Sequence, residues 1–240
     1  MTDFSRTFGN ADVDEAERER RIRRVFEAVA NRYDLMNDLM SFGIHRLWKR
    51  TLVRLAVPAD GQRIVDLAGG TGDVAALMAA DNRQVIVCDP CLPMMQVGRA
   101  RGRGPIEWLA GTAERLPFAA GSVDTLTIAF GIRNVTRIED ALAEAVRVLK
   151  PGGRFLCLEF STPWAPVRPM YNLFSTTVIP RLGAWVASAP EAYDYLVESI
   201  RRFPDQQTFK TMLEQAGFTA VRFRNLSCGI ACIHVGTRGA

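Results

Sequence analysis

Residues 63–73 read Arg63-Ile64-Val65-Asp66-Leu67-Ala68-Gly69-Gly70-Thr71-Gly72-Asp73, a short apolar run that passes directly into a glycine-rich loop. Such a run is typical of a buried parallel strand, and the glycines let the backbone adopt positive φ angles and approach a ligand closely. An amphipathic stretch follows, which predicts a helix that begins at the loop. A strand, a glycine loop and a helix N-terminus together predict a site for a nucleotide-like cofactor.

Four further apolar runs of similar length follow, each ending in a glycine or a polar turn. They cover residues 84–89, 106–110, 123–129 and 154–160. Amphipathic segments such as residues 138–149 separate them, and this alternation is typical of βαβ units with buried parallel strands. The sequence therefore predicts a doubly wound α/β domain.

The C-terminal part departs from this alternation. Residues 163–202 are rich in aromatic and apolar side chains, and we expect a mostly helical insertion there. Residues 217–225 and 229–236 read as two closing strands joined by a short turn, so they are antiparallel to each other. The predicted sheet has seven strands, mostly parallel with one antiparallel strand. Lys150-Pro151-Gly152-Gly153 is interpreted as the turn before the fifth strand.

The N-terminal residues 1–56 have a different pattern of charged and apolar residues from residues 57–240. Residues 1–13 are polar and are expected to be irregular, whereas the mixed-charge run 14–24 continues into a helical pattern. A second helical region, 35–55, is interrupted by a turn at Ser41-Phe42-Gly43. We predict an N-terminal helical segment attached to the α/β domain.

Composition and charge exclude several classes of protein. The chain has 240 residues, 48% of them hydrophobic, and a net charge of +4, which is far from the dense basic surface of a dedicated nucleic-acid binder. Five cysteines without a secretory leader predict reduced thiols and a cytoplasmic location. No apolar run reaches the roughly 18 residues of a membrane span. We expect a soluble protein that is at most peripheral to a membrane.

The glycine pattern distinguishes between cofactors. A dinucleotide fingerprint requires a further glycine three positions beyond Gly72, and the sequence has none there. Asp89 ends the second strand 17 residues after Gly72, at a position from which a carboxylate accepts hydrogen bonds from ribose hydroxyls. Asp66, the glycine loop and Asp89 fit S-adenosylmethionine, which has a ribose and an amino-acid tail but no pyrophosphate. An ordinary turn with a surface aspartate is the alternative.

Two later turns fall at the same predicted edge of the sheet, where α/β folds bind ligands. Residues 111–118 follow the third strand and residues 129–135 follow the fourth. The second turn lacks the Asn/Asp-Pro-Pro-aromatic motif of enzymes that methylate exocyclic base nitrogens, and it offers no cysteine for attack on cytosine. Arg133 is a cation at the mouth of the expected site or an ordinary surface arginine.

Cysteine spacing raises the question of a metal. Cys88 and Cys91 match a C-x-x-C pair, while Cys228, Cys232 and His234 share one face of a predicted strand. Cysteine is commonly a small buried hydrophobe, and the first pair lies at the expected ribose turn, so we predict no zinc or other metal.

Two longer stretches resemble one family. Residues 33–49, YDLMNDLMSFGIHRLWK, and residues 147–161, RVLKPGGRFLCLEFS, resemble the two signatures of the UbiE/MenG family, the C-methyltransferases of ubiquinone and menaquinone biosynthesis. The resemblance implies a class I S-adenosylmethionine-dependent methyltransferase fold, with the N-terminal segment as a substrate lid. It also implies C-methylation of a polyprenylated benzoquinol or naphthoquinol.

The resemblance carries cofactor roles onto positions of this chain. It implies that the glycine loop with Thr71 contacts the methionine part, that Asp89 contacts the ribose, and that Thr112 with Ala113 contacts the adenine. Ala129 occupies a further contact position. The cofactor residues expected in this way and from the glycine pattern are Asp66, Gly69, Gly70, Thr71, Gly72, Asp89, Thr112, Ala113 and Ala129. The family usually has Asn or Asp at position 112 and Ser at position 129, so the Ala129 contact lacks a side-chain hydroxyl.

The ring carbon is nucleophilic only in the quinol, where a hydroxyl loses its proton and pushes electrons onto the adjacent carbon. The resemblance points to Tyr33, Arg133 and Asp89 around that oxygen. A cationic Arg133 would stabilise the oxyanion and order a water that takes the proton. His45 and Asp38 are reserve candidates, and the alternative that they cap or stitch the N-terminal helices stays open.

The polyprenyl tail needs an apolar route, for which we consider Phe26, Met36, Met40, Phe42 and residues 170–186 as lining, as a membrane-touching lid, or simply as core. The resemblance implies the inner face of the membrane and a complex of quinone-pathway proteins as partners, and a homodimer stays open. Alternatives are a methyltransferase of the same fold acting on another lipid or small phenol, and a non-catalytic RNA-binding protein.

Overall fold

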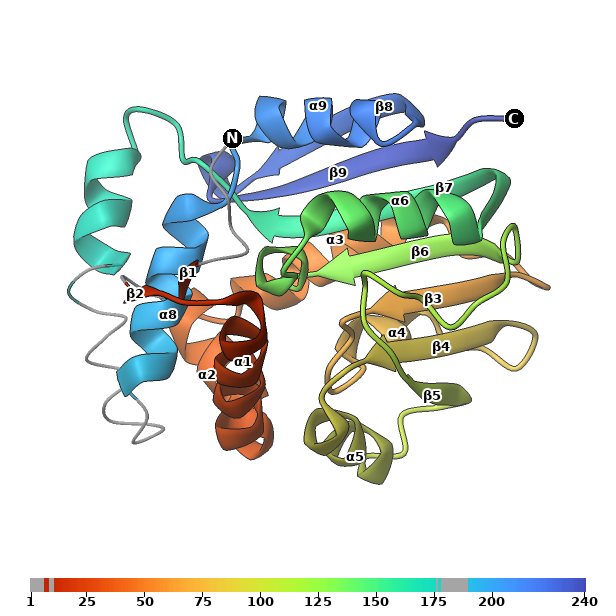
Figure 1. Ribbon diagram of the computed structural model, residues 1–240, viewed down its shortest axis with the longest axis horizontal. Helices are drawn as coiled ribbons and strands as arrows, with labels where there is room; N and C mark the ends of the chain where they lie inside the picture. Colours follow the sequence, from red (N-terminus) through yellow and green to blue (C-terminus); the bar gives the residue numbers. More distant parts are fainter. Residues whose placement is uncertain (1–6, 9–10, 176, 178–189) are drawn as a thin grey trace.

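The computed structural model describes residues 7–8, 11–175, 177 and 190–240. Within these ranges, a seven-stranded sheet has the order β5-β4-β3-β6-β7-β9-β8 (Figure 1). Its strands are β3 (Arg63–Leu67), β4 (Gln84–Asp89), β5 (Ile106–Ala110), β6 (Val123–Ala129), β7 (Leu149–Phe160), β8 (Phe218–Leu226) and β9 (Ala231–Arg238). Only β9 runs against its neighbours β7 and β8 among these strands, which confirms the predicted class I methyltransferase sheet with one antiparallel strand.

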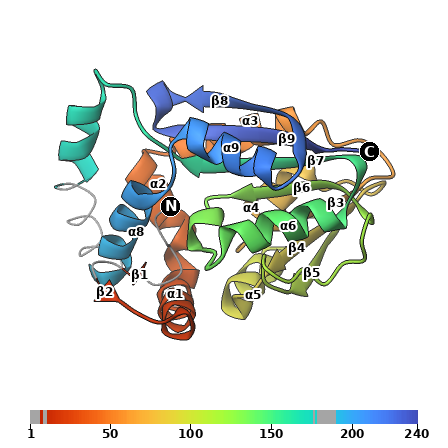
Figure 2. The same cartoon turned by 45° about the horizontal axis from the view of Figure 1, so that its top comes forward.

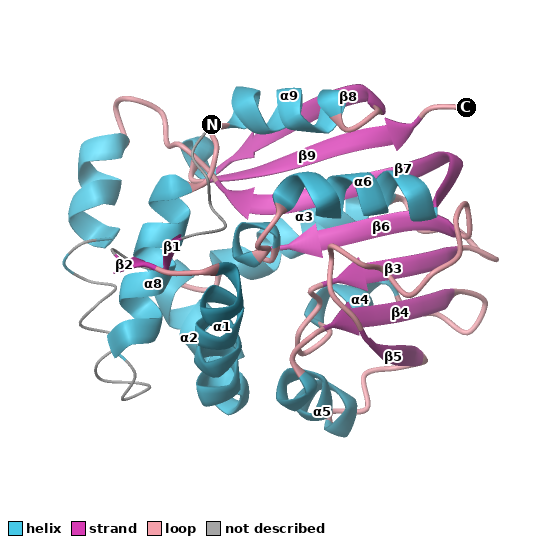
Figure 3. Cartoon of the chain, in the orientation of Figure 1, coloured by secondary structure: helices cyan, strands magenta, loops and turns pink. Residues whose placement is uncertain are grey.

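Helices cover both faces of the sheet (Figure 3). On one face α3 (Ile44–Ala56) and α4 (Asp73–Met78) pack on the sheet, and on the other lie α6 (Ile138–Val148) and α9 (Gln206–Gln215). Strand β7 shows why both faces are covered, since Phe155 packs toward α6 and α9 while Leu156 packs toward α3 and α4. The helix α5 (Leu92–Ala100) follows β4.

The remaining helices lie beyond the carboxyl ends of the parallel strands (Figures 1 and 2). They are α1 (Glu15–Val29), the 3-10 turn η2 (Ala30–Arg32), α2 (Tyr33–Ser41) and α8 (Pro190–Arg202). The predicted break between the second and third N-terminal helices is confirmed, because Phe42 and Gly43 have φ angles of 49° and 74°. No helix in the described ranges has the length and apolar character needed to cross a membrane.

Three local expectations need correction. Residues 1–13 are not wholly irregular, because β1 (Thr7–Phe8) pairs with β2 (Ala11–Asp12). The Lys150–Gly153 stretch lies inside β7 rather than before it, at a shift in the register between β6 and β7. Gly152 has a φ angle of +76°, which bends the chain locally, and the pairing of the two strands continues after it. Between the insertion and the closing strands, where no element was predicted, lies α9.

The helical insertion is partly described. Residues 168–175 are helical and α8 covers the insertion's end, whereas residues 178–189 lie outside the described residues. The division at residue 56 and the lid role of the N-terminal segment stay predictions.

Candidate active site

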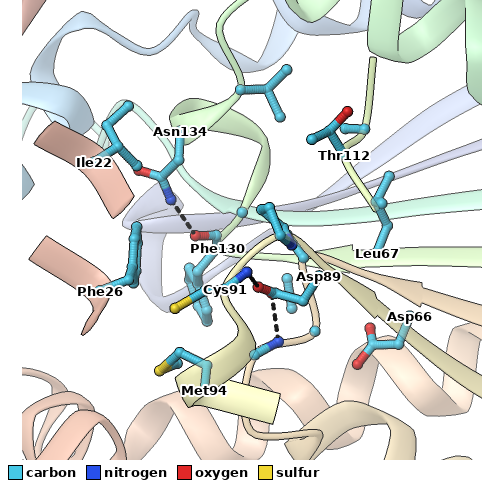
Figure 4. A pocket seen from close by; sticks show the side chains of 18 of the residues that line it. Ile22, Phe26, Asp66, Leu67, Asp89, Cys91, Met94, Thr112, Phe130 and Asn134 are labelled. Atoms are coloured by element: carbon cyan, nitrogen blue, oxygen red, sulfur yellow. Dashed lines mark hydrogen bonds between the residues drawn. The ribbon is translucent and has the colours of Figure 1, made fainter. Parts of the chain in front are cut away.

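A pocket lies where the carboxyl ends of β3, β4, β5 and β6 meet the N-terminal helices (Figure 4). The turns after these four strands line one side. Helix α1 lines the other side with Glu19, Ile22, Arg23 and Phe26, and Tyr33 adds the first residue of α2. The parallel sheet thus brings turns that are distant in sequence to one edge, and α1 closes over them.

The glycine loop forms the floor of the pocket. Asp66 lies beneath it and accepts hydrogen bonds from Thr127 Oγ1 at 2.8 Å and from the Ala75 amide at 3.2 Å. Burial raises the pKa of the Asp66 carboxyl to about 7. A Cβ at Gly69 would lie 2.8 Å from Asp66 Oδ2, so only glycine lets the loop approach this carboxyl. Gly72 does not line the pocket. It leaves room for the Trp108 ring, which would lie 2.7 Å from a Cβ at this position.

Asp89 lies at the end of β4 and faces the pocket (Figure 4). Its carboxylate accepts hydrogen bonds from the Gly70 amide at 2.9 Å and from the Cys91 amide at 2.7 Å. Burial raises its pKa. A carboxylate has about four acceptor positions, so two remain for a pair of hydroxyl groups.

The turns after β5 and β6 complete the wall. Thr112, Ala113 and Ala129 line the pocket as expected, with Thr112 exposed at the rim and Ala113 buried. Glu114 ties the two turns together, because its carboxylate accepts a hydrogen bond from the Thr136 amide at 3.0 Å. The apolar wall near them comes from residues such as Phe130.

The predicted catalytic residues divide between two places. Tyr33 lines the pocket beside Phe26, at a ring distance of 6.1 Å, and Asp89 shares this pocket. Arg133 is buried behind the lining, where Nη1 donates to the Phe130 carbonyl and to Glu159 Oε1, both at 2.7 Å. The structure therefore does not place Arg133 at the mouth, and its carboxylate partner Glu159 was missed by sequence analysis.

The reserve candidates His45 and Asp38 lie outside the pocket lining. His45 Nε2 is 2.8 Å from Asp38 Oδ1, and Arg46 donates two hydrogen bonds to the same carboxylate, at 2.7 and 2.6 Å. The hydrogen bonds from Arg46 lower the pKa of Asp38, while burial lowers that of His45. These contacts join α2 to α3, which favours the helix-stitching alternative.

Two basic residues near the pocket were not singled out from the sequence. Lys49, on α3, lines the pocket and donates to Asp73 Oδ2 at 3.0 Å. Arg18, on α1, is buried and donates to the carbonyls of Arg133 and Asn134 and to Thr136 Oγ1, at 3.2 to 3.3 Å. Lys49 ends the 33–49 stretch, which was a usable signal, whereas these three partners of Arg18 are more than 100 positions away.

Among the described residues, no three His, Cys, Asp or Glu side chains are close enough to share a metal ion. Cys91 lines the pocket, and Cys88 lies in β4 next to Asp89, where burial raises the pKa of the Cys88 thiol to about 12.

The residues of the pocket fit S-adenosylmethionine. The acidic lining of Asp66, Asp73, Asp89, Glu19 and Glu114 suits a ligand with cationic sulfonium and ammonium groups. Asp89 has acceptor capacity for two ribose hydroxyls, and the glycine floor admits a close approach of ligand to backbone.

Comparisons with known proteins agree with this geometry. The sequence model of the ubiE/COQ5 methyltransferase family matches residues 14–238. The chain belongs to this family. It is 70% identical over 239 residues to the ubiquinone/menaquinone biosynthesis C-methyltransferase UbiE of Rubrivivax gelatinosus, covering 100% of this chain and 95% of that one. The enzyme of the same name from Paracoccus denitrificans is 50% identical over 237 residues, with 95% of each chain covered.

Solved structures show the same fold for this ubiE/COQ5 methyltransferase. A SAM-dependent methyltransferase of Thermotoga maritima aligns with a TM-score of 0.67 at 21% identity, covering 90% of this chain and 99% of that one. At this identity the likeness shows the class I methyltransferase fold alone.

Proposed function

We propose that this methyltransferase transfers a methyl group from S-adenosylmethionine to a ring carbon of a polyprenylated benzoquinol or naphthoquinol. The observation that carries the proposal is the 70% identity, over the full length of the chain, to a UbiE C-methyltransferase. The pocket supports it, because it joins the glycine loop, Asp89 and Tyr33 under one helical cover.

The cofactor supplies an electrophilic methyl group on a sulfonium. Asp89 is proposed to accept hydrogen bonds from the ribose hydroxyls, and the glycine loop with Thr71 to contact the methionine part. Thr71 is held for this by Asp34, whose Oδ1 accepts its hydroxyl at 3.2 Å. Thr112 and Ala113 are proposed to bind the adenine edge, and Ala129 offers backbone only.

The quinol must lose a hydroxyl proton for its ring carbon to attack. Tyr33 is proposed to orient the quinol oxygen from inside the pocket. The Arg133 guanidinium is proposed to stabilise the oxyanion, with Glu159 fixing its orientation through the 2.7 Å hydrogen bond. A guanidinium is a poor base, so water remains the proposed proton acceptor. Helix α1 limits solvent access from above.

Apolar side chains of the N-terminal helices support a proposal for the polyprenyl tail. Phe26 lines the pocket and Met36 is buried near it, whereas Phe42 is 75% exposed. We propose that the tail passes along the N-terminal helices to the inner face of the cytoplasmic membrane, where the protein binds peripherally. A complex with other quinone-pathway proteins and a homodimer are part of this proposal.

The test is methyl transfer from labelled S-adenosylmethionine to short-tailed demethylmenaquinol and to 2-polyprenyl-6-methoxybenzoquinol, with and without a chemical reductant. Transfer that depends on the reductant is expected, because only the quinol is nucleophilic, and the preferred ring identifies the substrate. If neither reduced ring is methylated while the protein binds the cofactor, the substrate is another lipid or phenol. Salt-dependent RNA binding without cofactor binding would overturn the enzyme proposal.

A further inference from the structure

Lys49 is a buried cation at the floor of the pocket that the proposed mechanism leaves without a task. It projects from α3 into the lining and is 7% exposed. Its ammonium donates one hydrogen bond within the described residues, to Asp73 Oδ2 at 3.0 Å. An ammonium has three N–H donors, so two remain for a ligand.

Lys49 is not the only cation near Asp73 within the described residues. The Asp73 carboxylate also accepts a hydrogen bond from Arg103, and Arg101 Nη1 lies 4.0 Å from it. Arg101 pairs more closely with Asp34, so the Asp73 carboxylate is shared mainly between Lys49 and Arg103. Lys49 lines the same pocket as Gly69 and Gly70, and its charge opposes the rise in the pKa of Asp66 that burial causes.

Lys49 is one of few cations in a mostly acidic pocket lining. Among the described lining residues, five are acidic and two, Arg23 and Lys49, are basic. Arg23 is exposed on α1, whereas Lys49 is buried. Lys49 is hydrogen-bonded to Asp73, the residue that directly follows the glycine loop. The methionine part of S-adenosylmethionine carries a carboxylate in addition to its two cationic groups. In an otherwise acidic pocket that carboxylate needs a cation beside the loop.

We propose that Lys49 binds the carboxylate of the methionine part of the cofactor and thereby makes the site specific for an intact amino-acid tail. The inference rests on the proposed use of S-adenosylmethionine. It adds a ligand-binding residue from α3, in the N-terminal segment, to a cofactor site built mainly by the turns that follow the strands.

The experiment is calorimetric titration of three ligands into the full-length protein. S-adenosylhomocysteine has the carboxylate, its decarboxylated analogue has only the amine, and 5′-methylthioadenosine lacks the amino-acid tail. For Lys49→Met we expect the affinity for S-adenosylhomocysteine to fall about 10- to 100-fold, the range of a hydrogen bond between charged groups. Affinity for methylthioadenosine should stay within about 2-fold, and the decarboxylated analogue should bind no more weakly than before.

Two further variants keep the test decisive. Lys150→Met removes a lysine that pairs with Asp124 at 2.7 Å away from the pocket, and it should leave all three affinities unchanged. Lys49→Arg keeps the cation and should retain the preference for S-adenosylhomocysteine over the decarboxylated analogue even if Lys49→Met does not fold. Equal weakening of all three ligands, or unchanged binding of S-adenosylhomocysteine, would overturn the role of Lys49. Failure of the wild type to bind any adenosyl ligand would instead overturn the proposed function.

Discussion

The ion pair between Arg133 and Glu159 is nearly completely buried, with side-chain exposures of 6% and 2%. Glu159→Gln keeps the shape of the side chain but leaves the guanidinium without a counter-charge. Breaking one side of a buried pair costs about 3–5 kcal/mol, so we expect a loss of that order in the free energy of unfolding, measured by urea titration. Methyl transfer should fall as well, because Arg133 loses its fixed orientation.

A matched control is Glu15→Gln, which breaks the pair of Glu15 with Arg137. Both side chains of that pair are about half exposed, at 43% and 53%. Exposed pairs contribute up to about 1 kcal/mol, so the control should change the stability little. Similar small losses for the two variants would show that the Arg133 pair is solvated and carries no special task.

Asp66 gives the protein a specific pH dependence. Its pKa of about 7 lies above the ordinary 3.8, so between these values the native state holds a proton that the unfolded chain has released. The free energy of unfolding should therefore decrease as pH rises through this window, by up to about 1.4 kcal/mol per pH unit. In Asp66→Asn this contribution is absent, so the stability of the variant relative to wild type should rise from pH 4 to pH 7. If the free energies of unfolding of wild type and Asp66→Asn differ by the same amount at every pH, the raised pKa of Asp66 is contradicted.

Sequence reasoning found the residues whose signal is local and missed those whose partners are distant. The glycine loop was recognisable because it follows directly on its strand, and Asp89 because it is the last residue of the next strand. The contacts of Glu159 with Arg133 and of Lys49 with Asp73 join residues 26 and 24 positions apart, and they form only through the fold. No periodicity within a single segment encodes such contacts.

Helix α5 supports the glycine loop through a close backbone contact. A Cβ at Gly98 would lie 2.6 Å from the Thr71 carbonyl and 2.4 Å from the Trp108 ring. Alanine is favoured over glycine in a helix by about 1 kcal/mol, so helix propensity alone predicts that Gly98→Ala stabilises. We expect the opposite, a lower melting temperature and weaker binding of S-adenosylhomocysteine, because the loop must move. A variant more stable than wild type with unchanged affinity would disprove the contact.

Helix α1 is held over the pocket by Arg18, which also donates to the Thr7 carbonyl at 3.2 Å. Arg18→Met removes this anchor and the hydrogen bonds to residues 133–136. We expect faster amide hydrogen exchange in α1 with unchanged exchange in the sheet, measured by mass spectrometry. Arg24→Met, on the exposed side of the same helix, is the control. Uniformly faster exchange across the whole chain would mean that Arg18 stabilises the fold rather than the position of α1.

At the level of elements, strands were easier to predict than their connections. The predicted runs 84–89, 106–110 and 123–129 match β4, β5 and β6 residue for residue. Strands β4 and β6 are mostly buried and are therefore continuous apolar runs, whereas β5 lies at the edge of the sheet and has only half-buried and exposed residues. The start of β7 was wrong, since Pro and Gly mark a change of direction but do not tell whether hydrogen-bonded pairing continues through it. The sequence of α9 has no clear pattern of apolar and polar residues. Its buried face is defined by Phe209 and Leu213, which pack on the sheet.

At the scale of the whole molecule, the helices beyond the strand ends carry an exposed apolar patch formed by Phe42, Met170 and Leu173. These side chains are 75%, 70% and 65% exposed. The Phe42 ring lies 5.8 Å from that of Phe174, which joins the end of α2 to the helix 168–175. A large exposed apolar area marks a site of interaction. Here the helices that carry it lie beyond the strand ends, as does α1 (Figure 1).

The proposed contact with lipid makes a direct prediction for this patch. Phe42→Ser together with Met170→Ser should lower sedimentation with phosphatidylglycerol/phosphatidylethanolamine vesicles about 10-fold, because each side chain loses about 1 kcal/mol or more of apolar burial in the bilayer. Leu92→Ser, which replaces a residue 54% exposed at the start of α5, should bind vesicles like wild type. Transfer to a substrate without a tail should be equal in all three proteins, because the patch lies outside the pocket. If the double variant still sediments like wild type, the lipid contact lies elsewhere, and the tail must reach the pocket by a route that does not pass this patch.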